Sequence, residues 1–278
     1  MEQVQVISAV VYPISRKINC FNHRYIFDLT YCKNGRLCVS VVNTTGLDPS
    51  LNFSIESVEY LSLHGSYICI TKRTSEMCLI YWGDTALKSK NLPYGNADHF
   101  WPTSPELLHG YTPNGLAVCK SGAILVCLWN HQVHEQSLGN LIKLKNFGIK
   151  LFEIETDKNR PLFTCPTYIT ENGNEDICVS DVNAVVVTDV GGLLRFRYKG
   201  LSDDSQFDPY GICCDSQNNI IIADMMKNRI HMIDENGEFL HYIQYKDMHK
   251  PRALCIDEED NLYVGEWMSY EIKVLSRR

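Results

Sequence analysis

The stretch between residues 207 and 245 alternates apolar and polar positions in short blocks. Polar turns rich in Asp and Asn separate the apolar blocks from one another. Runs of this length, rich in β-branched residues and joined by short turns, predict antiparallel strands in meander order. Four such strands are expected here, at residues 211–214, 220–223, 229–233 and 239–243.

The same unit recurs along the chain at a fixed interval. A period of this size, made only of strands and turns, is typical of a β-propeller, in which four-stranded blades surround a channel. Helical repeats of similar length would show a 3.6-residue period, which these copies lack. An earlier copy is marked by Asp181, 43 residues before Asp224. Three positions return 42 residues later, as the pairs Pro209 and Pro251, Asp215 and Asp257, and Asp224 and Glu266.

The pattern predicts one all-β domain, residues 1–278, folded as a six-bladed propeller. The third blade carries an apparent insertion at residues 130–150. The last unit supplies only three strands, whereas residues 4–11 read as a lone strand. We expect strand 4–11 to complete the last blade, because joining the first and last blades leaves no open edge. The expected blades are residues 14–54, 55–106, 107–165, 166–206, 207–247 and 248–278.

Charge and cysteine content narrow the compartment and the chemistry. The net charge of −7 does not favour binding of nucleic acid or membrane by the molecule as a whole. No apolar run approaches the roughly 20 residues that span a bilayer. No CxxC pair occurs among the 12 cysteines, so we expect reduced, buried thiols, a cytoplasmic location, and no cofactor or metal. The cysteines inside apolar runs include Cys38, Cys69, Cys119, Cys127, Cys178, Cys213 and Cys255.

Several segments of the central unit carry a family resemblance. They are PYGI at 209–212, Asp215, IIAD at 221–224, NRI at 228–230 and the turn at 234–237, and they resemble the NHL repeat. The chain is similar to the NHL propeller that ends TRIM-type (tripartite motif) ubiquitin ligases, and most like the invertebrate, molluscan set.

This resemblance covers residues 111–278 and departs from the pattern at Lys227, where the repeat usually has Asn. It implies a monomeric propeller that recognises substrates for a ligase. Zinc-ligand spacing of the kind a RING or B-box needs does not occur in the chain. Ligase activity would therefore belong to other segments of a parent protein.

Blade geometry predicts two faces of opposite charge. The first face carries the turns between first and second and between third and fourth strands, and collects the acidic segments DSQNN, DEED, DENGE, DVGG and ETDKN. The second face carries the second-to-third turns and the crossings between blades. It collects Lys143, Lys145, Lys150, Lys227, Arg229, Lys246, Lys250 and Arg252.

Aromatic residues accompany the basic residues on the second face, a combination that is typical of interfaces. A structural alternative is that Tyr111, Tyr210 and Trp267 plug the channel mouth or pack between blades. Arg229 is expected to tie neighbouring blades through carboxylates such as Asp181. The predicted partner-binding residues are Tyr111, Asn114, Trp129, His131, Tyr210, Lys227, Arg229, Lys250, Arg252, Trp267 and Tyr270.

Three functions remain open. The first is a non-catalytic module that binds a protein partner through the basic and aromatic face. The second is single-stranded RNA binding on that face, with bases stacked on aromatic rings and phosphates met by Lys and Arg. The third is a metal-dependent hydrolase or lyase with its site in the channel. We expect no metal at His131 and His134, although Glu135 or His109 could complete a ligand set there.

Overall fold

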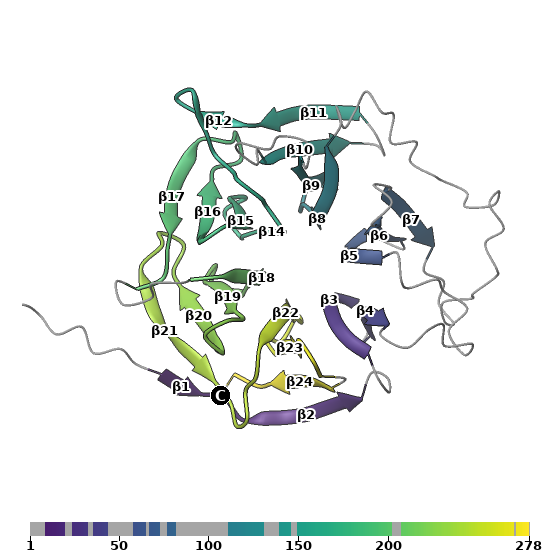
Figure 1. Cartoon of the computed structure of the whole chain (residues 1–278), viewed down its shortest axis with the longest axis vertical. Coiled ribbons are helices and arrows are strands. Elements are labelled where there is room, and N and C mark those ends of the chain that lie inside the picture. Colours follow the sequence, from purple (N-terminus) through teal and green to yellow (C-terminus); the bar gives the residue numbers. More distant parts are fainter. Residues whose placement is uncertain are drawn as a thin grey trace, which may run out of the picture.

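The computed structural model describes residues 9–19, 24–32, 36–43, 58–64, 67–72, 77–81, 111–130, 139–145, 149–201, 207–269 and 271–277. Every helix or strand found in these ranges is a β-strand, so the all-β prediction is confirmed. The sheets are arranged around a common axis, each presenting one strand to the centre (Figure 1).

Four sheets have four consecutive neighbours in antiparallel order. The first contains β8 (Thr112–Val118), β9 (Ile124–Trp129), β10 (Gly139–Lys145) and β11 (Ile149–Ile154). The next contains β14 (Tyr168–Glu171), β15 (Ile177–Asp181), β16 (Ala184–Thr188) and β17 (Leu194–Tyr198). The third contains β18 (Pro209–Cys214), β19 (Ile220–Asp224), β20 (Arg229–Ile233) and β21 (Phe239–Gln244). The fourth contains β22 (Pro251–Ile256), β23 (Leu262–Glu266), β24 (Glu271–Leu275) and β2 (Ile14–Asn19).

Smaller sheets complete the described structure. A hairpin joins β3 (Arg24–Cys32) to β4 (Arg36–Asn43), and a meander joins β5 (Val58–His64), β6 (Tyr67–Lys72) and β7 (Met77–Tyr81). The inner strands β3, β5, β8, β14, β18 and β22 neighbour one another in turn and return to β3. Buried apolar side chains fill the spaces between adjacent sheets. This is a propeller-like arrangement (Figure 1).

The N-terminal closure involves other residues than predicted. The strand that completes the last sheet is β2, which pairs antiparallel with β24 from Ile14 to Asn19. Strand β1 (Ala9–Val11) instead pairs in parallel with β21 of the preceding sheet. Residues 4–8 lie outside the described residues. The prediction of strand 4–11 was therefore wrong in position, because Pro13 separates two pairing segments and Ile14 and Ile18 contact the core.

The apparent insertion at residues 130–150 contains a regular strand. Residues 139–145 form β10, which pairs with β9 and with β11 as the third strand of its sheet. Two lysines disguise this strand in the sequence. Lys143 is buried, and its ammonium lies 5.5 Å from the centre of the Phe152 ring, so its stem packs in the sheet as an apolar residue would.

Repeated turns explain why the first face is acidic. Each first-to-second turn spans five residues, and its fourth residue has positive φ, as at Glu175, Asn218 and Asp260. The leading side chain accepts backbone N–H groups two and four residues on, as Asp215 does from Gln217 and Asn219. Many of these carboxylates therefore build turns. Segment 155–159, expected among them, forms a small hairpin after β11, between β12 (Thr156–Asp157) and β13 (Arg160–Pro161).

A second repeated carboxylate ends the second strand of each well-described sheet. Asp181 accepts the backbone N–H groups of Thr164 and Cys165, on the segment that enters its sheet. Glu266 accepts the N–H of His249 in the same way. These positions share the 42- to 43-residue period, so the periodic acidic residues anchor the crossings between sheets.

Candidate partner-binding surface

Three predicted site residues meet around the guanidinium of Arg252. This group lies 4.7 Å from the centre of the Tyr210 ring and 4.7 Å from that of Trp267. Phe27 of β3 adds a third ring at 4.1 Å. Arg252 is only 9% exposed, so its charge is enclosed by aromatic faces rather than offered to solvent. We call Phe27, Tyr210, Arg252 and Trp267 the arginine cage.

Tyr168 extends the cage toward the channel axis. Its hydroxyl donates to the Phe27 carbonyl over 2.6 Å, and its ring meets the Tyr210 ring edge-on, with centroids 6.3 Å apart. Burial raises the pKa of Tyr168, although the positive charge of Arg252 opposes this rise. Tyr210 and Trp267 therefore pack around the channel end, as their structural alternative expected.

Exposed side chains of two neighbouring sheets form one surface beside the cage. Met226, in the β19–β20 turn, is 58% exposed, and Met268, in the β23–β24 turn, is 56% exposed. Lys250 joins the two turns: its N–H donates to the Asn228 side chain over 2.7 Å, and its ammonium lies 3.8 Å from the Met268 sulfur. Its carbonyl accepts the N–H of Trp267. We define the methionine–lysine patch as Met226, Lys227, Asn228, Lys250, Trp267 and Met268.

Other predicted residues serve packing. Asn114 is buried and donates to the Pro166 carbonyl over 3.1 Å. Arg229 stacks on Tyr242 of its own sheet at 4.8 Å and donates to its hydroxyl over 3.1 Å. Tyr111 is half-buried against the core of β8 to β10, and burial raises its pKa. Trp129 is half-buried at the end of β9.

The basic residues of segment 139–150 do not reach the second face. Lys145 and Lys150 flank the connection between β10 and β11, which is a third-to-fourth turn and belongs to the first face. Lys150 pairs with Glu153 at 2.8 Å. Lys246 remains exposed in the crossing before β22. The residues His109, His131, His134, Glu135 and Tyr270 lie outside the described residues.

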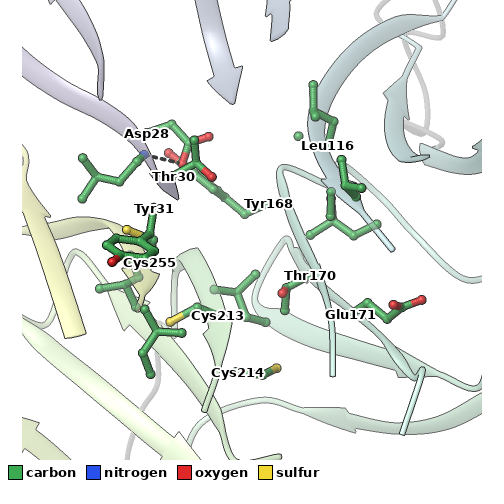
Figure 2. A pocket seen from close by; sticks show the side chains of 18 of the residues that line it. Asp28, Thr30, Tyr31, Leu116, Tyr168, Thr170, Glu171, Cys213, Cys214 and Cys255 are labelled. Atoms are coloured by element: carbon green, nitrogen blue, oxygen red, sulfur yellow. Dashed lines mark hydrogen bonds between the residues drawn. The ribbon is translucent and has the colours of Figure 1, made fainter. Parts of the chain in front are cut away.

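A cavity of about 250 Å³ occupies the channel on the first-face side of the cage. The C-terminal halves of β3, β8, β14, β18 and β22 line it, and Tyr168 lies on its wall next to the cage. Figure 2 shows its polar lining, with Asp28, Thr30 and Tyr31 on one side and Thr170 and Glu171 on the other.

The described thiols are free and largely buried. Cys119, Cys127, Cys178, Cys213 and Cys255 are all buried and unpaired by disulfides, as predicted. Burial raises the pKa of Cys119 to about 12, so this thiol stays protonated at neutral pH. The side chains of Cys38 and Cys69 lie outside the described residues.

Within the described part of the chain, no three or more His, Cys, Asp or Glu side chains are grouped so that they could hold a metal ion. The same part contains no helix suited to crossing a membrane.

Sequence reasoning missed two features of this surface. Phe27 and Tyr168 entered no prediction, because only the folded chain brings them to Arg252. Met226 and Met268 were also missed, although they stand 42 residues apart in equivalent turns. An apolar residue repeated at a turn position, rather than in an apolar run, is the signal that could have identified them.

No protein-family model matches the chain. One stretch is similar to protein lin-41 of Caenorhabditis elegans, with 31% identity over 85 residues. That stretch is 30% of this chain and 7% of lin-41, so the chain corresponds to a small part of that relative.

Similar solved structures cover nearly the whole chain. Regucalcin, a calcium-binding protein from Agrobacterium tumefaciens, aligns with a TM-score of 0.61 and 13% identity, over 97% of this chain and 98% of that one. Virginiamycin B lyase from Staphylococcus aureus aligns with a TM-score of 0.57 and 14% identity, over 95% and 99% of the two chains. The WD40 β-propeller domain of Doa1 aligns with a TM-score of 0.52 and 10% identity, over 96% and 97%. At these identities the likeness concerns the fold alone, and we conclude that the chain has a β-propeller fold with a local sequence similarity to lin-41.

Proposed function

We propose that this propeller is a non-catalytic recognition module that binds a protein partner through the methionine–lysine patch. The observation that carries the proposal is the continuity of this patch across two sheets, joined by the contacts of Lys250 with Asn228, Trp267 and Met268. Two exposed methionines beside lysines offer an adaptable apolar surface with positive charge. An acidic protein segment with an apolar anchor residue is the complementary partner.

The arginine cage gives this surface a rigid base. Trp267 belongs to both the cage and the patch, and its ring is held against Arg252. An interface residue that is already ordered loses little conformational entropy on binding. The patch therefore combines a fixed aromatic centre with flexible methionines at its edge.

The propeller is proposed to have six blades and to belong to the TRIM-type NHL proteins. Six inner strands neighbouring one another in a closed ring support the blade number. The similarity to lin-41, a TRIM–NHL protein, supports the family. In this reading the chain selects cytoplasmic substrates for a ubiquitin ligase whose catalytic segments lie elsewhere in a parent protein.

Single-stranded RNA is the less favoured ligand of the same face. RNA binding modules stack bases on open aromatic rings. The guanidinium of Arg252 covers one face of Tyr210 and one face of Trp267. The two candidate stacking residues are therefore engaged within the protein, which favours the protein partner.

The proposal is tested by comparing the proteins retained from an extract of the source cells by three variants. The double variant Lys227→Glu/Lys250→Glu reverses the charge of the patch and leaves Arg252 in place. The control Lys145→Glu/Lys199→Glu makes the same charge change at two exposed lysines outside the patch. A protein retained by the wild type and the control, and lost from the patch variant, is the expected result. Equal retention by all three would contradict the proposal.

A parallel measurement addresses the RNA alternative. Fluorescence anisotropy with a pool of short single-stranded RNAs, from about 50 to 200 mM salt, reports phosphate contacts as a steep loss of affinity. We expect weak binding that is the same for both double variants. Tight, salt-sensitive binding lost only from the patch variant would replace the protein partner by RNA.

A further inference from the structure

The channel cavity has one closed end. On its second-face side stands Tyr168, packed against the arginine cage. On its first-face side the lining continues into the turn that carries Lys120. A ligand of this cavity would therefore enter from the first face, and its site would be separate from the methionine–lysine patch.

Carboxylates dominate the charge of this cavity and of its entrance. Asp28 lies on the wall and is 7% exposed, and Glu171 lies at the rim, where it accepts the N–H of Lys120 over 2.6 Å. The ammonium of Lys120 is bound to the Gly173 carbonyl at 2.9 Å. The described first-to-second turns around the entrance add Glu175, Asp176, Asp215, Asp257, Glu258, Glu259 and Asp260.

Part of this negative charge is balanced by arginines. Arg195 pairs with Asp176, and Arg277 pairs with Asp215 at 2.6 Å. The remaining carboxylates share one end of a narrow, low-dielectric channel, a geometry that concentrates cations at its entrance. The charge of the entrance and the buried carboxylate on the wall therefore favour the same sign of ligand.

The remaining lining suits an organic group. Tyr31 and Tyr168 present aromatic rings, and Leu116 and Ile212 present apolar surface. Thr30 and Thr170 add hydroxyl groups that can accept a hydrogen bond (Figure 2). An ammonium or guanidinium on a short aliphatic stem would find a carboxylate, hydroxyl acceptors and apolar contacts in one cavity.

We propose that the channel cavity binds a small organic cation, an ammonium or guanidinium group on an aliphatic stem, that enters from the first face. Two sources share this chemistry: a free amine, or a lysine or arginine side chain of a protein. Asp28 pairs with the cation, and Glu171 attracts it at the rim.

The test is isothermal titration calorimetry of the whole chain at low ionic strength with four probes of equal stem length. These are n-butylamine, n-butylguanidine, n-butanol and butyrate. We expect the two cations to bind with a Kd of roughly 1 mM or tighter, and butanol and butyrate at least about tenfold more weakly. Equal affinity for butylamine and butanol, or no heat from either cation, would overturn the proposal.

Variants locate the site. Asp28→Asn keeps an oxygen that can accept the N–H of Leu29, which Asp28 accepts at 2.9 Å, and should weaken butylamine binding about tenfold. Glu238→Gln removes an exposed carboxylate in a third-to-fourth turn of the same face and should change the affinity less than about twofold. Unchanged affinity in a folded Asp28→Asn protein contradicts the assignment.

Two additions keep the experiment decisive. If Asp28→Asn does not fold, Glu171→Gln replaces it, with an expected weakening of about threefold, and unchanged affinity there overturns the site. A blocked peptide with one central lysine distinguishes the sources. Tighter binding of the peptide than of butylamine, with the same loss in the variant, assigns a protein side chain, whereas binding of butylamine alone assigns a free amine.

Discussion

At the scale of single residues, Arg252 shows how a charged side chain can become part of a core. Its guanidinium is enclosed by Phe27, Tyr210 and Trp267 at 4.1 to 4.7 Å. A planar, weakly hydrated cation stacks on aromatic rings at a low desolvation cost. The residue therefore stabilises the second-face end of the channel and is not available to bind a partner directly.

Replacing Arg252 by Lys should destabilise the protein by about 1–3 kcal/mol, because an ammonium cannot stack in place of the planar group. The free energy of unfolding in urea measures this loss. Arg160→Lys is the matched control at an exposed position, and its effect should stay within about 0.5 kcal/mol. A loss no larger than that of the control would show that the cage contributes nothing to stability.

Met268 carries backbone strain on the patch. Its φ of 71° lies in the left-handed region, which a side chain such as Met adopts at a cost and Asn adopts readily. We expect Met268→Asn to raise the free energy of unfolding by about 0.5–1 kcal/mol while it weakens retention of the partner. A thermal denaturation curve and the extract experiment together report both effects. A variant that is more stable and retains the partner fully would remove Met268 from the interface.

At the scale of elements, the two N-terminal strands have different tasks. Strand β2 completes the last sheet by pairing with β24, and its Ile18 contacts the core. Strand β1 has three exposed residues and adds to the edge of β21. Only β2 covers an edge that would otherwise be open between the chain ends.

Deletion of residues 1–11 should therefore cost less than about 1 kcal/mol of stability, whereas deletion of residues 1–19 should cost about 3 kcal/mol or more. Urea unfolding compares the two proteins. Size-exclusion chromatography should also show association of the shorter protein through the exposed edge of β24. Similar stability of the two deletions would mean that β2 does not close the ring.

The junction between β1 and β21 should respond to acid. His241 of β21 stacks on Tyr12, with ring centroids 6.5 Å apart. Burial and the nearby positive charge of Arg277 lower the pKa of His241. A lowered folded-state pKa means that the unfolded chain binds more protons. The stability it contributes is present above the unfolded pKa of about 6.5 and is lost as the pH falls through the folded pKa.

We therefore expect wild-type stability to fall more steeply than that of His241→Gln between about pH 7.5 and pH 5.5. Urea unfolding of both proteins at each pH isolates the contribution of His241, since the other titrating groups are shared. Parallel pH curves for the two proteins would show that His241 titrates alike in the folded and unfolded states.

At the scale of the whole molecule, local patterns predicted the all-β propeller arrangement. Alternating apolar runs and Asp-led turns act within a few residues of one another, and the fixed period then indicates how the units repeat. The closure residues were mispredicted because strand pairing between the chain ends depends on contacts across more than 250 residues. Strand β10 was hidden because a buried Lys143 interrupts its apolar pattern.

The candidate site was less accessible to sequence reasoning. Charge placed Lys227 and Lys250 on one face, and the structure brings both to the methionine–lysine patch. The role of Arg252 could not be predicted, because its aromatic partners come from residues 27, 210 and 267 on separate strands and turns. Side chains that meet only through tertiary packing leave no local signal in one sequence.

The central claim is that the patch on the second face contacts a protein partner. Site-specific photo-crosslinking tests it most directly, with p-benzoylphenylalanine placed at Met226 in the patch or at Leu193, which is 66% exposed in a first-face turn. In an extract of the source cells, position 226 should yield discrete adducts that are sensitive to protease and insensitive to ribonuclease, and position 193 should not yield them. The same adducts from both positions, or only nucleic acid adducts at position 226, would contradict the account.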